Sequence, residues 1–161
     1  NGILNLTKVE NQSILTNVTE YNLSEQIRLT VLLLESKWTA RNINMNIDFG
    51  EYTINANEEM MKQVWINLLD NAIKFSPEGE EISIRISNKN EHIYVSISGK
   101  GPHIEDEEIN KIFRKFYQSD SSHSTEGTGI GLALVSRIIE LHKGRIEVNS
   151  DKNINTFTVI L

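Results

Sequence analysis

The chain of 161 residues contains no cysteine, which excludes disulfide bonds and thiol chemistry. No run of about 18 apolar residues is present, so no membrane-spanning helix is expected. Basic residues are outnumbered: 16 Lys and Arg stand against 22 Asp and Glu, and the net charge of −6 offers no field for gathering nucleic acid. The 4 histidines lack metal-ligand spacing, so no zinc site is expected. The 39% hydrophobic content is enough for one sizeable core.

One stretch, Asn-Leu-Leu-Asp-Asn-Ala-Ile-Lys-Phe at residues 67–75, places three polar side chains on one face of a predicted helix. Asn67, Asn71 and Lys74 stand at i, i+4 and i+7, while most residues around them are apolar. A solvated helix face would explain such a stripe. However, Asn is a poor helix former, and two of them one turn apart favour a specific polar partner. Amide oxygens can ligate Mg²⁺, and a lysine can neutralise phosphate oxygens.

Hydrophobic periodicity predicts alternating strands and helices along the rest of the chain. Ser24 is expected to start the first helix, Asn57 to cap the second, and Gly144 to end the last. Gly50 is expected at a turn between two strands. The strongly polar residues 117–127 are expected to form a mobile loop. The expected strands are residues 21–23, 43–49, 52–56, 82–86, 93–97, 145–149 and 156–161, and the expected helices are residues 24–38, 58–75, 105–113 and 130–142.

Three alternating glycines, Gly127, Gly129 and Gly131, lie where the polar loop enters a predicted helix. Backbone N–H groups in such a run can close around an anion, so phosphate binding there needs no charged side chain. Glycines also cap helices and form turns, so the run alone is a weak indication. The position of the glycine run after the Asn-Asn-Lys helix strengthens the interpretation as a phosphate-binding site.

The order of the motifs resembles the catalytic, ATP-binding domain of two-component sensor histidine kinases, part of the gyrase, heat-shock chaperone, histidine kinase and mismatch-repair ATPase superfamily. The motifs are the Asn-Asn-Lys helix, Gly99-Lys100-Gly101-Pro102, Phe113-x-x-Phe116, the polar loop and the Gly-x-Gly-x-Gly run. The resemblance implies an α/β two-layer sandwich of the Bergerat type, with about three helices covering one face of a mixed sheet of about five strands. It also implies that residues 21–161 are the catalytic domain and residues 1–20 the end of a dimerisation helix plus linker.

The resemblance implies a nucleotide site with ATP and Mg²⁺ as its cofactors. Asn71 resembles the Mg²⁺ ligand, Asn67 the supporting polar residue one turn earlier, and Lys74 the phosphate contact, so Asn67 and Lys74 are the catalytic candidates. In ATP-hydrolysing relatives a glutamate at the position of Asn67 activates water, and an amide cannot act as that base, so a kinase is favoured over an ATPase. The further implied nucleotide contacts are Phe75, Gly101, Phe116, Gly127, Thr128, Gly129, Gly131 and Leu132, with Phe113 and Phe116 as the aromatic pair that anchors the loop.

The first glycine box departs from the family pattern Asp-x-Gly-x-Gly. Gly99 stands where the family has the aspartate that accepts a hydrogen bond from the adenine amino group, and His103 replaces the second glycine. Losing a charged acceptor opposite a buried donor costs about 1.5 to 3 kcal/mol, or about one to two powers of ten in affinity. ATP binding is therefore expected to be weak or absent.

Several expectations concern the rest of a longer protein. Residues 1–20 contain no histidine, so the phosphoacceptor histidine would lie on an absent dimerisation domain, and this chain alone is not expected to autophosphorylate. The resemblance further implies a response-regulator receiver as partner, a homodimeric parent and no nucleic-acid partner. The domain is expected to be cytoplasmic and its parent membrane-anchored.

Two alternatives stay open. A degenerate kinase-like domain would have kept the fold and its partner contacts without nucleotide affinity, which Gly99 and His103 favour. An anti-sigma-factor serine kinase of the same superfamily would be a freestanding domain without the helix end at residues 1–18.

Overall fold

The computed structural model describes residues 14–113 and 130–161, and residues 1–13 and 114–129 lie outside the described part. None of the helices within those two ranges is long and apolar enough to cross a membrane. The elements in chain order are β1 (Thr19–Asn22), α2 (Leu23–Leu33), α3 (Glu35–Ala40), β2 (Asn44–Ile47), β3 (Thr53–Ala56), α4 (Glu58–Phe75), β4 (Glu81–Lys89), β5 (His92–Lys100), α5 (Asp106–Ile109), α6 (Ile130–Leu141), β6 (Arg145–Asp151) and β7 (Ile154–Ile160).

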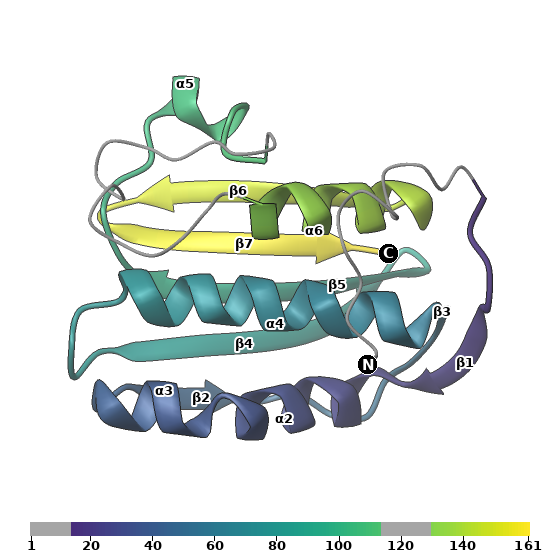
Figure 1. Ribbon diagram of the computed structural model, residues 1–161, viewed down its shortest axis with the longest axis horizontal. Coiled ribbons are helices and arrows are strands. Elements are labelled where there is room, and N and C mark those ends of the chain that lie inside the picture. The colour runs from purple at the N-terminus through teal and green to yellow at the C-terminus, as the bar shows by residue number, and fades with distance from the viewer. Residues whose placement is uncertain (1–13, 114–129) are drawn as a thin grey trace.

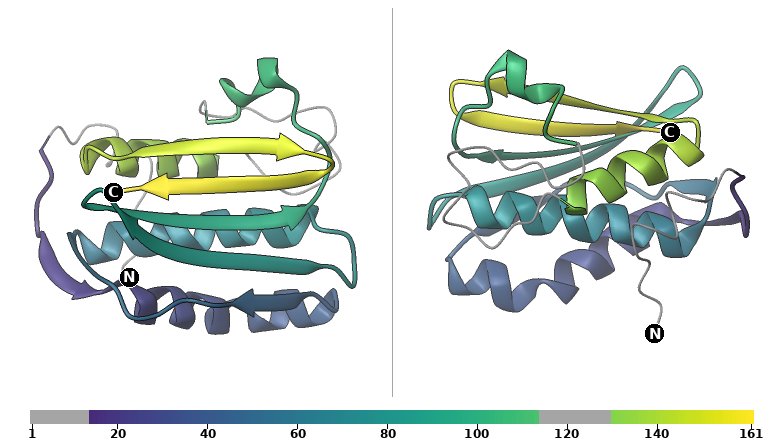
Figure 2. Two further views of the ribbon diagram at one scale, coloured as in Figure 1. Left: turned by 180° about the vertical axis from the view of Figure 1, so that it is seen from behind. Right: turned by 45° about the horizontal axis from the view of Figure 1, so that its top comes forward.

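A five-stranded sheet in the order β2-β4-β5-β7-β6 forms one layer of the structure. Strand β2 pairs with β4 in parallel, and the other neighbours are antiparallel, so the sheet is mixed. Helices α2, α4 and α6 form the second layer and cover the same face of the sheet (Figures 1 and 2). The predicted two-layer α/β sandwich, with about five strands and about three helices, is confirmed.

Alternation along the central strands decides which face of the sheet the helices cover. Ile82 and Ile84 of β4 and Val95 and Ile97 of β5 are buried and share one face, whereas Arg85 between them is exposed on the other. Seen from behind, the second face carries none of the helices formed by residues 14–113 and 130–161 (Figure 2). The period-2 pattern that predicted these strands therefore also predicted which residues would line the core.

The first helix begins differently from the prediction. Asn22, not Ser24, is its N-cap, because the Asn22 side chain accepts a hydrogen bond from the Glu25 backbone N–H at 2.8 Å. Ser24 is buried and serves another purpose: its Oγ donates to the Gly50 carbonyl at 2.7 Å and accepts from the Tyr52 N–H at 2.9 Å. Ser24 therefore fixes the loop before β3 rather than the helix start.

The predicted single helix over residues 24–38 is in fact two helices, α2 and α3, with a break at Leu34. The indole N–H of Trp38 donates to the Val31 carbonyl at 2.9 Å and so satisfies a carbonyl at the end of α2. The prediction was wrong because an amphipathic pattern continues across the break.

The predicted turn at Gly50 does not join a pair of neighbouring strands. Strand β3 pairs antiparallel with β1 in a separate two-stranded sheet, in which Thr19 lies opposite Ala56, whereas β2 pairs with β4. The predicted helix over residues 105–113 is also shorter, because α5 ends at Ile109.

A buried amide joins α2, α4 and β1 beneath the helical layer. The Gln26 side-chain oxygen accepts from Tyr21 Oη at 2.7 Å and from the Trp65 indole N–H at 2.8 Å, and its Nε2 donates to the Glu58 carbonyl at 2.9 Å. Burial raises the pKa of Tyr21, so its hydroxyl stays a donor to Gln26. This network fixes the start of α4 against α2.

Gly144, which was predicted to end the last helix, has a different role in the structure. The left-handed residue after this helix is Lys143, with φ 59°, and Gly144 is not at positive φ. Instead Gly144 lies against the end of β7, where a Cβ would overlap the Ile160 carbonyl oxygen and lie 3.1 Å from Leu161 Cδ2. Close approach to backbone, and not chain reversal, requires a glycine here.

We expect Gly144→Ala to lower the free energy of unfolding by about 1 to 3 kcal/mol, because the added methyl group must displace backbone. Urea denaturation of the two proteins measures the difference. Gly50→Ala is the matched control: no atom lies within 4 Å of its Cβ position, so its effect should stay within about 0.5 kcal/mol. Equal losses from both substitutions would contradict the packing role of Gly144.

Candidate functional site

Helix α4 carries the polar stripe predicted from the sequence. Asn57 caps the helix by accepting from the Met60 N–H at 3.0 Å, and Asn67, Asn71 and Lys74 follow on one partly exposed face. The opposite faces are packed into the core. The buried residues of this helix are Met60, Met61, Val64, Trp65, Leu68, Leu69 and Ile73.

Asn67 lies at the contact between α4 and the start of α6. Its Nδ2 donates to the Gln63 carbonyl of its own helix at 2.7 Å, so this Asn side chain bonds the helix backbone without interrupting the helix. Its Oδ1 lies only 2.5 Å from the position that a Cβ on Gly131 would occupy. Gly131 thus lets the first turn of α6 lie directly against the polar stripe, a packing reason for this glycine that the sequence pattern did not reveal.

A cluster of two ammonium groups and one carboxylate extends the stripe. Asp70 contacts Lys37 Nζ of α3 at 2.8 Å through Oδ1 and Lys74 Nζ at 3.4 Å through Oδ2. The pairs are partly exposed, so each stabilises the fold little, but together they carry net positive charge beside Asn71. The Asp70 and Lys74 spacing of i, i+4 was readable from the sequence. The participation of Lys37 was not, because it comes from a distant helix.

The end of β5 meets the end of α4 at Gly101. A Cβ there would lie 3.0 Å from Asn155 Nδ2 and 3.3 Å from the Phe75 carbonyl oxygen, so only glycine fits between these groups without displacing them. Two residues earlier, Gly99 pairs with Ile82 on the helix-covered face of the sheet. A Cβ at Gly99 would lie 3.3 Å from Ile82 Cγ1, an apolar neighbour.

His103 contacts the β6–β7 hairpin through Ser150. Its Nδ1 lies 3.0 Å from Ser150 Oγ, which donates to Asn155 Oδ1 at 2.6 Å and also accepts from the Ile104 N–H at 3.0 Å. Asn155 Nδ2 in turn donates to the Pro102 carbonyl at 3.0 Å. The loop after β5 is therefore held by side chains from β6 and β7. Nothing in the sequence indicated that Ser150 and Asn155 belong to this loop.

The remaining predicted site residues fall into two groups. Phe113 packs edge-on against Phe157, with ring centroids 6.2 Å apart, and Leu132 on α6 is partly buried against the core. The others lie outside the described residues: Phe116, Gly127, Thr128 and Gly129.

The described residues suit a phosphate-bound magnesium ion better than a metal held by protein alone. In the two described ranges no group of three or more His, Cys, Asp or Glu residues is placed to hold a metal. Mg²⁺ takes few protein ligands and keeps waters and phosphate oxygens, so the Asn71 amide beside Lys74 fits it. At Gly99, a Cβ would have Ile82 Cγ1 and, at 4.0 Å, the Glu81 backbone carbonyl oxygen as its neighbours, and no carboxylate.

The C-terminal half of α4, the end of β5 and the start of α6 carry most of the predicted site residues that the structure describes. In Figure 1 the ends of α4 and β5 lie on the same side of the molecule, and α6 runs antiparallel to α4 with its first residues toward that side. The start of α6 thus lies against Asn67, and the stripe continues from there through Asn71 and Lys74 toward the end of α4. An ammonium group and helical N–H groups attract anions, so the arrangement can hold a phosphate chain.

Comparisons with known proteins agree with this geometry. Residues 56–161, about two thirds of the chain, match the family described as histidine kinase-, DNA gyrase B-, and HSP90-like ATPase. The chain is 29% identical over 161 residues to the sensor histidine kinase CusS of Escherichia coli, covering 99% of this chain and 34% of that protein. It is 39% identical over 140 residues to the adaptive-response sensory kinase SasA of Prochlorococcus marinus, covering 84% of this chain and 37% of that protein. The chain therefore spans about a third of the length of these relatives.

Solved structures show the same fold. The catalytic domain of histidine kinase ThkA superposes with a TM-score of 0.82 at 32% identity, covering 91% of this chain and 95% of that domain. ThkA in complex with the response regulator protein TrrA gives a TM-score of 0.82 at 28% identity, covering 97% of this chain and 44% of that one. The chain thus belongs to the histidine kinase-, DNA gyrase B- and HSP90-like ATPase family, and it is a catalytic, ATP-binding domain of the sensor histidine kinase type.

Proposed function

We propose that this domain binds ATP with Mg²⁺ and that, in a longer protein, it presents the γ-phosphate to a histidine on a dimerisation domain. The observation that supports this most directly is the contact of Gly131 with Asn67, because it sets the start of α6 against the polar stripe that continues through Asn71 and Lys74. Phosphoryl transfer asks a protein mainly for positioning and charge neutralisation. The stripe and the helix start offer both.

Each residue has a chemical role in this proposal. Asn71 would hold Mg²⁺, which when bound neutralises phosphate charge, and Lys74 would contact a phosphate oxygen. Asp70 positions Lys74, and Lys37 offsets the negative charge that Asp70 brings to the site. Asn67 cannot abstract a proton from water, which favours transfer to a protein over hydrolysis. The proposed nucleotide contacts are Phe75, Gly101, Phe116, Gly127, Thr128, Gly129, Gly131 and Leu132.

The longer protein would supply the remaining parts of the pathway. We place the end of a dimerisation helix and a linker in residues 1–20, ahead of the catalytic domain at residues 21–161, and a homodimer as the parent. A response-regulator receiver would take the phosphate, and the existence of a ThkA complex with TrrA supports a partner of this kind. We further propose that the domain is cytoplasmic and that its parent is membrane-anchored.

A second candidate function is a degenerate kinase-like domain that serves as an interaction module. Gly99 supports it, since the helix-covered side of β5 then lacks a carboxylate to accept from adenine. His103 supports it less than its sequence position implies, because its side chain is taken up in holding the loop to Ser150. The affinity for ATP separates the two candidates.

We expect this chain to bind ATP and Mg²⁺ more weakly than micromolar and Gly99→Asp to tighten binding by about one to two powers of ten. The new carboxylate would accept a charged hydrogen bond from the adenine amino group, and Ile82 must yield slightly because the Cβ lies 3.3 Å from it. Isothermal titration calorimetry measures both affinities. GTP is the matched control ligand, and Gly99→Asp should not tighten its binding. No ATP binding by either protein would favour the interaction module, and sub-micromolar binding by the unaltered chain would refute the impairment.

The contact between the two helices can be tested separately from nucleotide binding. Gly131→Ala should lower the free energy of unfolding by about 1 to 3 kcal/mol, because its Cβ meets Asn67 Oδ1 at 2.5 Å. In an Asn67→Ala background the same change should be neutral or stabilising, because alanine is the better helix former and the overlapping oxygen is gone. Chemical denaturation of all four proteins gives this double-mutant cycle. Additive effects would show that the two residues do not set the spacing of α4 and α6.

A further inference from the structure

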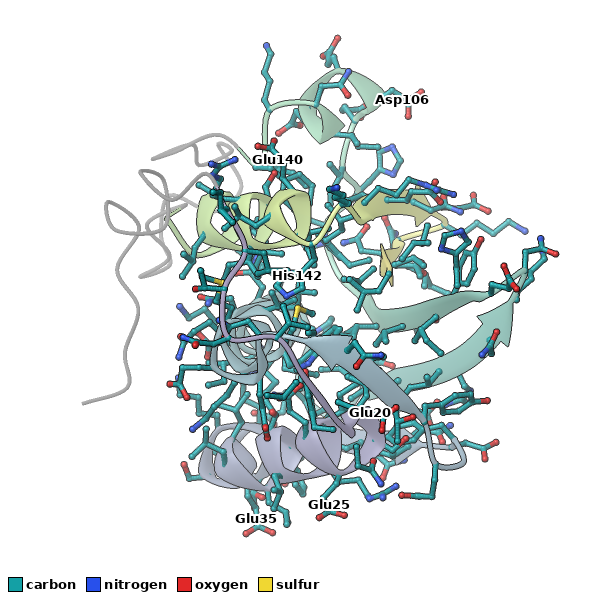
Figure 3. The ribbon with its side chains drawn as sticks, turned by 90° about the vertical axis from the view of Figure 1, so that its right-hand side faces the viewer. Glu20, Glu25, Glu35, Asp106, Glu140 and His142 are labelled. Atoms are coloured by element: carbon teal, nitrogen blue, oxygen red, sulfur yellow. The ribbon has the colours of Figure 1, made fainter. Side chains whose placement is uncertain are left out.

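A histidine joins the end of α6 to the start of α4. His142 Nδ1 lies 2.8 Å from the Ile138 carbonyl oxygen, and its Nε2 lies 3.1 Å from the backbone nitrogen of Asn57. A carbonyl only accepts and a backbone N–H only donates, so the neutral imidazole with its proton on Nδ1 satisfies both partners. Figure 3, which labels His142, shows it between the two helices.

Asn57 also holds the segment that leads into the domain. Its Oδ1 accepts from the Met60 N–H at 3.0 Å, and its Nδ2 donates to the Thr16 carbonyl at 2.8 Å. Only 7% of Asn57 is exposed, and Leu15 packs against the core beside this bond. One buried asparagine therefore connects three parts of the chain: residues 14–18, the first turn of α4 and, through its backbone, the last turn of α6.

Protonation of His142 is incompatible with this arrangement. An imidazolium carries N–H on both ring nitrogens, so Nε2 would point a donor at the Asn57 N–H, and a buried donor would lose its acceptor. Burial lowers the pKa of His142, and the bond to Ile138 opposes that effect in part. Residues 14–18 carry no charge. The charged residues within five positions of Asn57 or His142 along the chain are Glu58, Glu59, Lys62, Arg137, Glu140, Lys143, Arg145 and Glu147, and Glu20 of β1 lies opposite Asn55.

We propose that Asn57 and His142 form a pH-sensitive anchor for residues 14–18, which holds this segment while His142 is neutral and releases it when His142 is protonated. The unfolded chain takes up the proton near the ordinary histidine value of 6.5, and the folded chain only at lower pH. The anchor is therefore complete above pH 6.5, and its contribution is lost as the pH falls from there through the lower pKa of the folded state. The consequence for catalysis rests on the proposed function: residues 1–20 would lead from the dimerisation helix, so Asn57 would be a positioning residue that sets how the domain faces its phosphoacceptor.

Nuclear magnetic resonance on the 161-residue chain without nucleotide tests the anchor. The ring nitrogen shifts of His142 report its tautomer, and backbone relaxation reports the mobility of residues 14–18 between pH 8 and pH 5. We expect the proton on Nδ1 at pH 8. On acidification, the mobility of residues 14–18 should rise and the exchange protection of the Asn57 amide should fall about tenfold. Both changes should have the same midpoint as the titration of His142.

Two substitutions separate the anchor from general acid effects. His142→Gln keeps a neutral acceptor near the position of Nε2 and should leave residues 14–18 equally ordered at pH 8 and pH 5. His92→Gln, at an exposed histidine on β5, should leave the pH dependence unchanged. Unchanged mobility in the unaltered chain while its His142 is protonated, or persistence of the full pH dependence in His142→Gln, would overturn the proposal. If His142→Gln does not fold, a proton on Nε2 at pH 8 in the unaltered chain would overturn it alone. None of these outcomes depends on ATP binding, so their failure would leave the proposed function standing.

Discussion

The spacing between α4 and α6 is the constraint on which the site depends. Asn67 Oδ1 lies 2.5 Å from the position that a Cβ on residue 131 would take, so Gly131 lets α6 begin beside the polar stripe without moving the Asn67 side chain. Asn67 tolerates its place within a helix because its amide binds the Gln63 carbonyl one turn back. The contact thus links a packing requirement to the proposed chemistry, since the same approach sets the first turn of α6 against the Asn67 amide, on the helix face that also carries Asn71 and Lys74. At the opposite ends of these helices, His142 and Asn57 hold the pair together.

The two sides of the site differ in how completely they fit a nucleotide. On the phosphate side, Asn71, Lys74 and the start of α6 offer an amide, a positive charge and a helix terminus. On the base side, Gly99 offers no acceptor, although the loop that follows is well held by Ser150 and Asn155. Under the proposed function, the residues that would position the phosphates are therefore present, while the hydrogen bond to the adenine amino group would be missing. On that proposal, a loss of about 1.5 to 3 kcal/mol would weaken ATP binding by about one to two powers of ten and would leave the phosphate contacts in place.

Local chemistry explains which parts of the fold could be predicted from the sequence. The bounds of α4 were predictable because the Asn57 cap and the Ser76-Pro77 stop act within one turn of the helix ends. The break between α2 and α3 at Leu34 was not predictable, because the amphipathic pattern continues across it and the bond from the Trp38 indole to the Val31 carbonyl is a contact in space. Contacts in space limited the prediction of the site in the same way.

The stripe of Asn67, Asn71 and Lys74 follows from helical spacing alone, and the family resemblance suggested its role in binding Mg²⁺ and phosphate. Contacts between distant segments could not be predicted. Lys37 reaches Asp70 from another helix, and Ser150 holds His103 from another strand. Gly144 was predicted to be a glycine needed for a helix end, but the neighbouring strand, invisible in a local pattern, is what requires it. Strand order was likewise hidden, since β3 leaves the main sheet to pair with β1.

The most direct measurement is a crystal structure of this chain at saturating concentrations of a non-hydrolysable ATP analogue and Mg²⁺. The proposed function predicts the phosphates between the α4 stripe and the start of α6, with the metal at the Asn71 amide and the base beside Gly99. A nucleotide bound elsewhere on the molecule, or a metal without contact to Asn71, would contradict it. Crystals that hold no nucleotide at saturation would assign the domain to the kinase-like interaction modules instead.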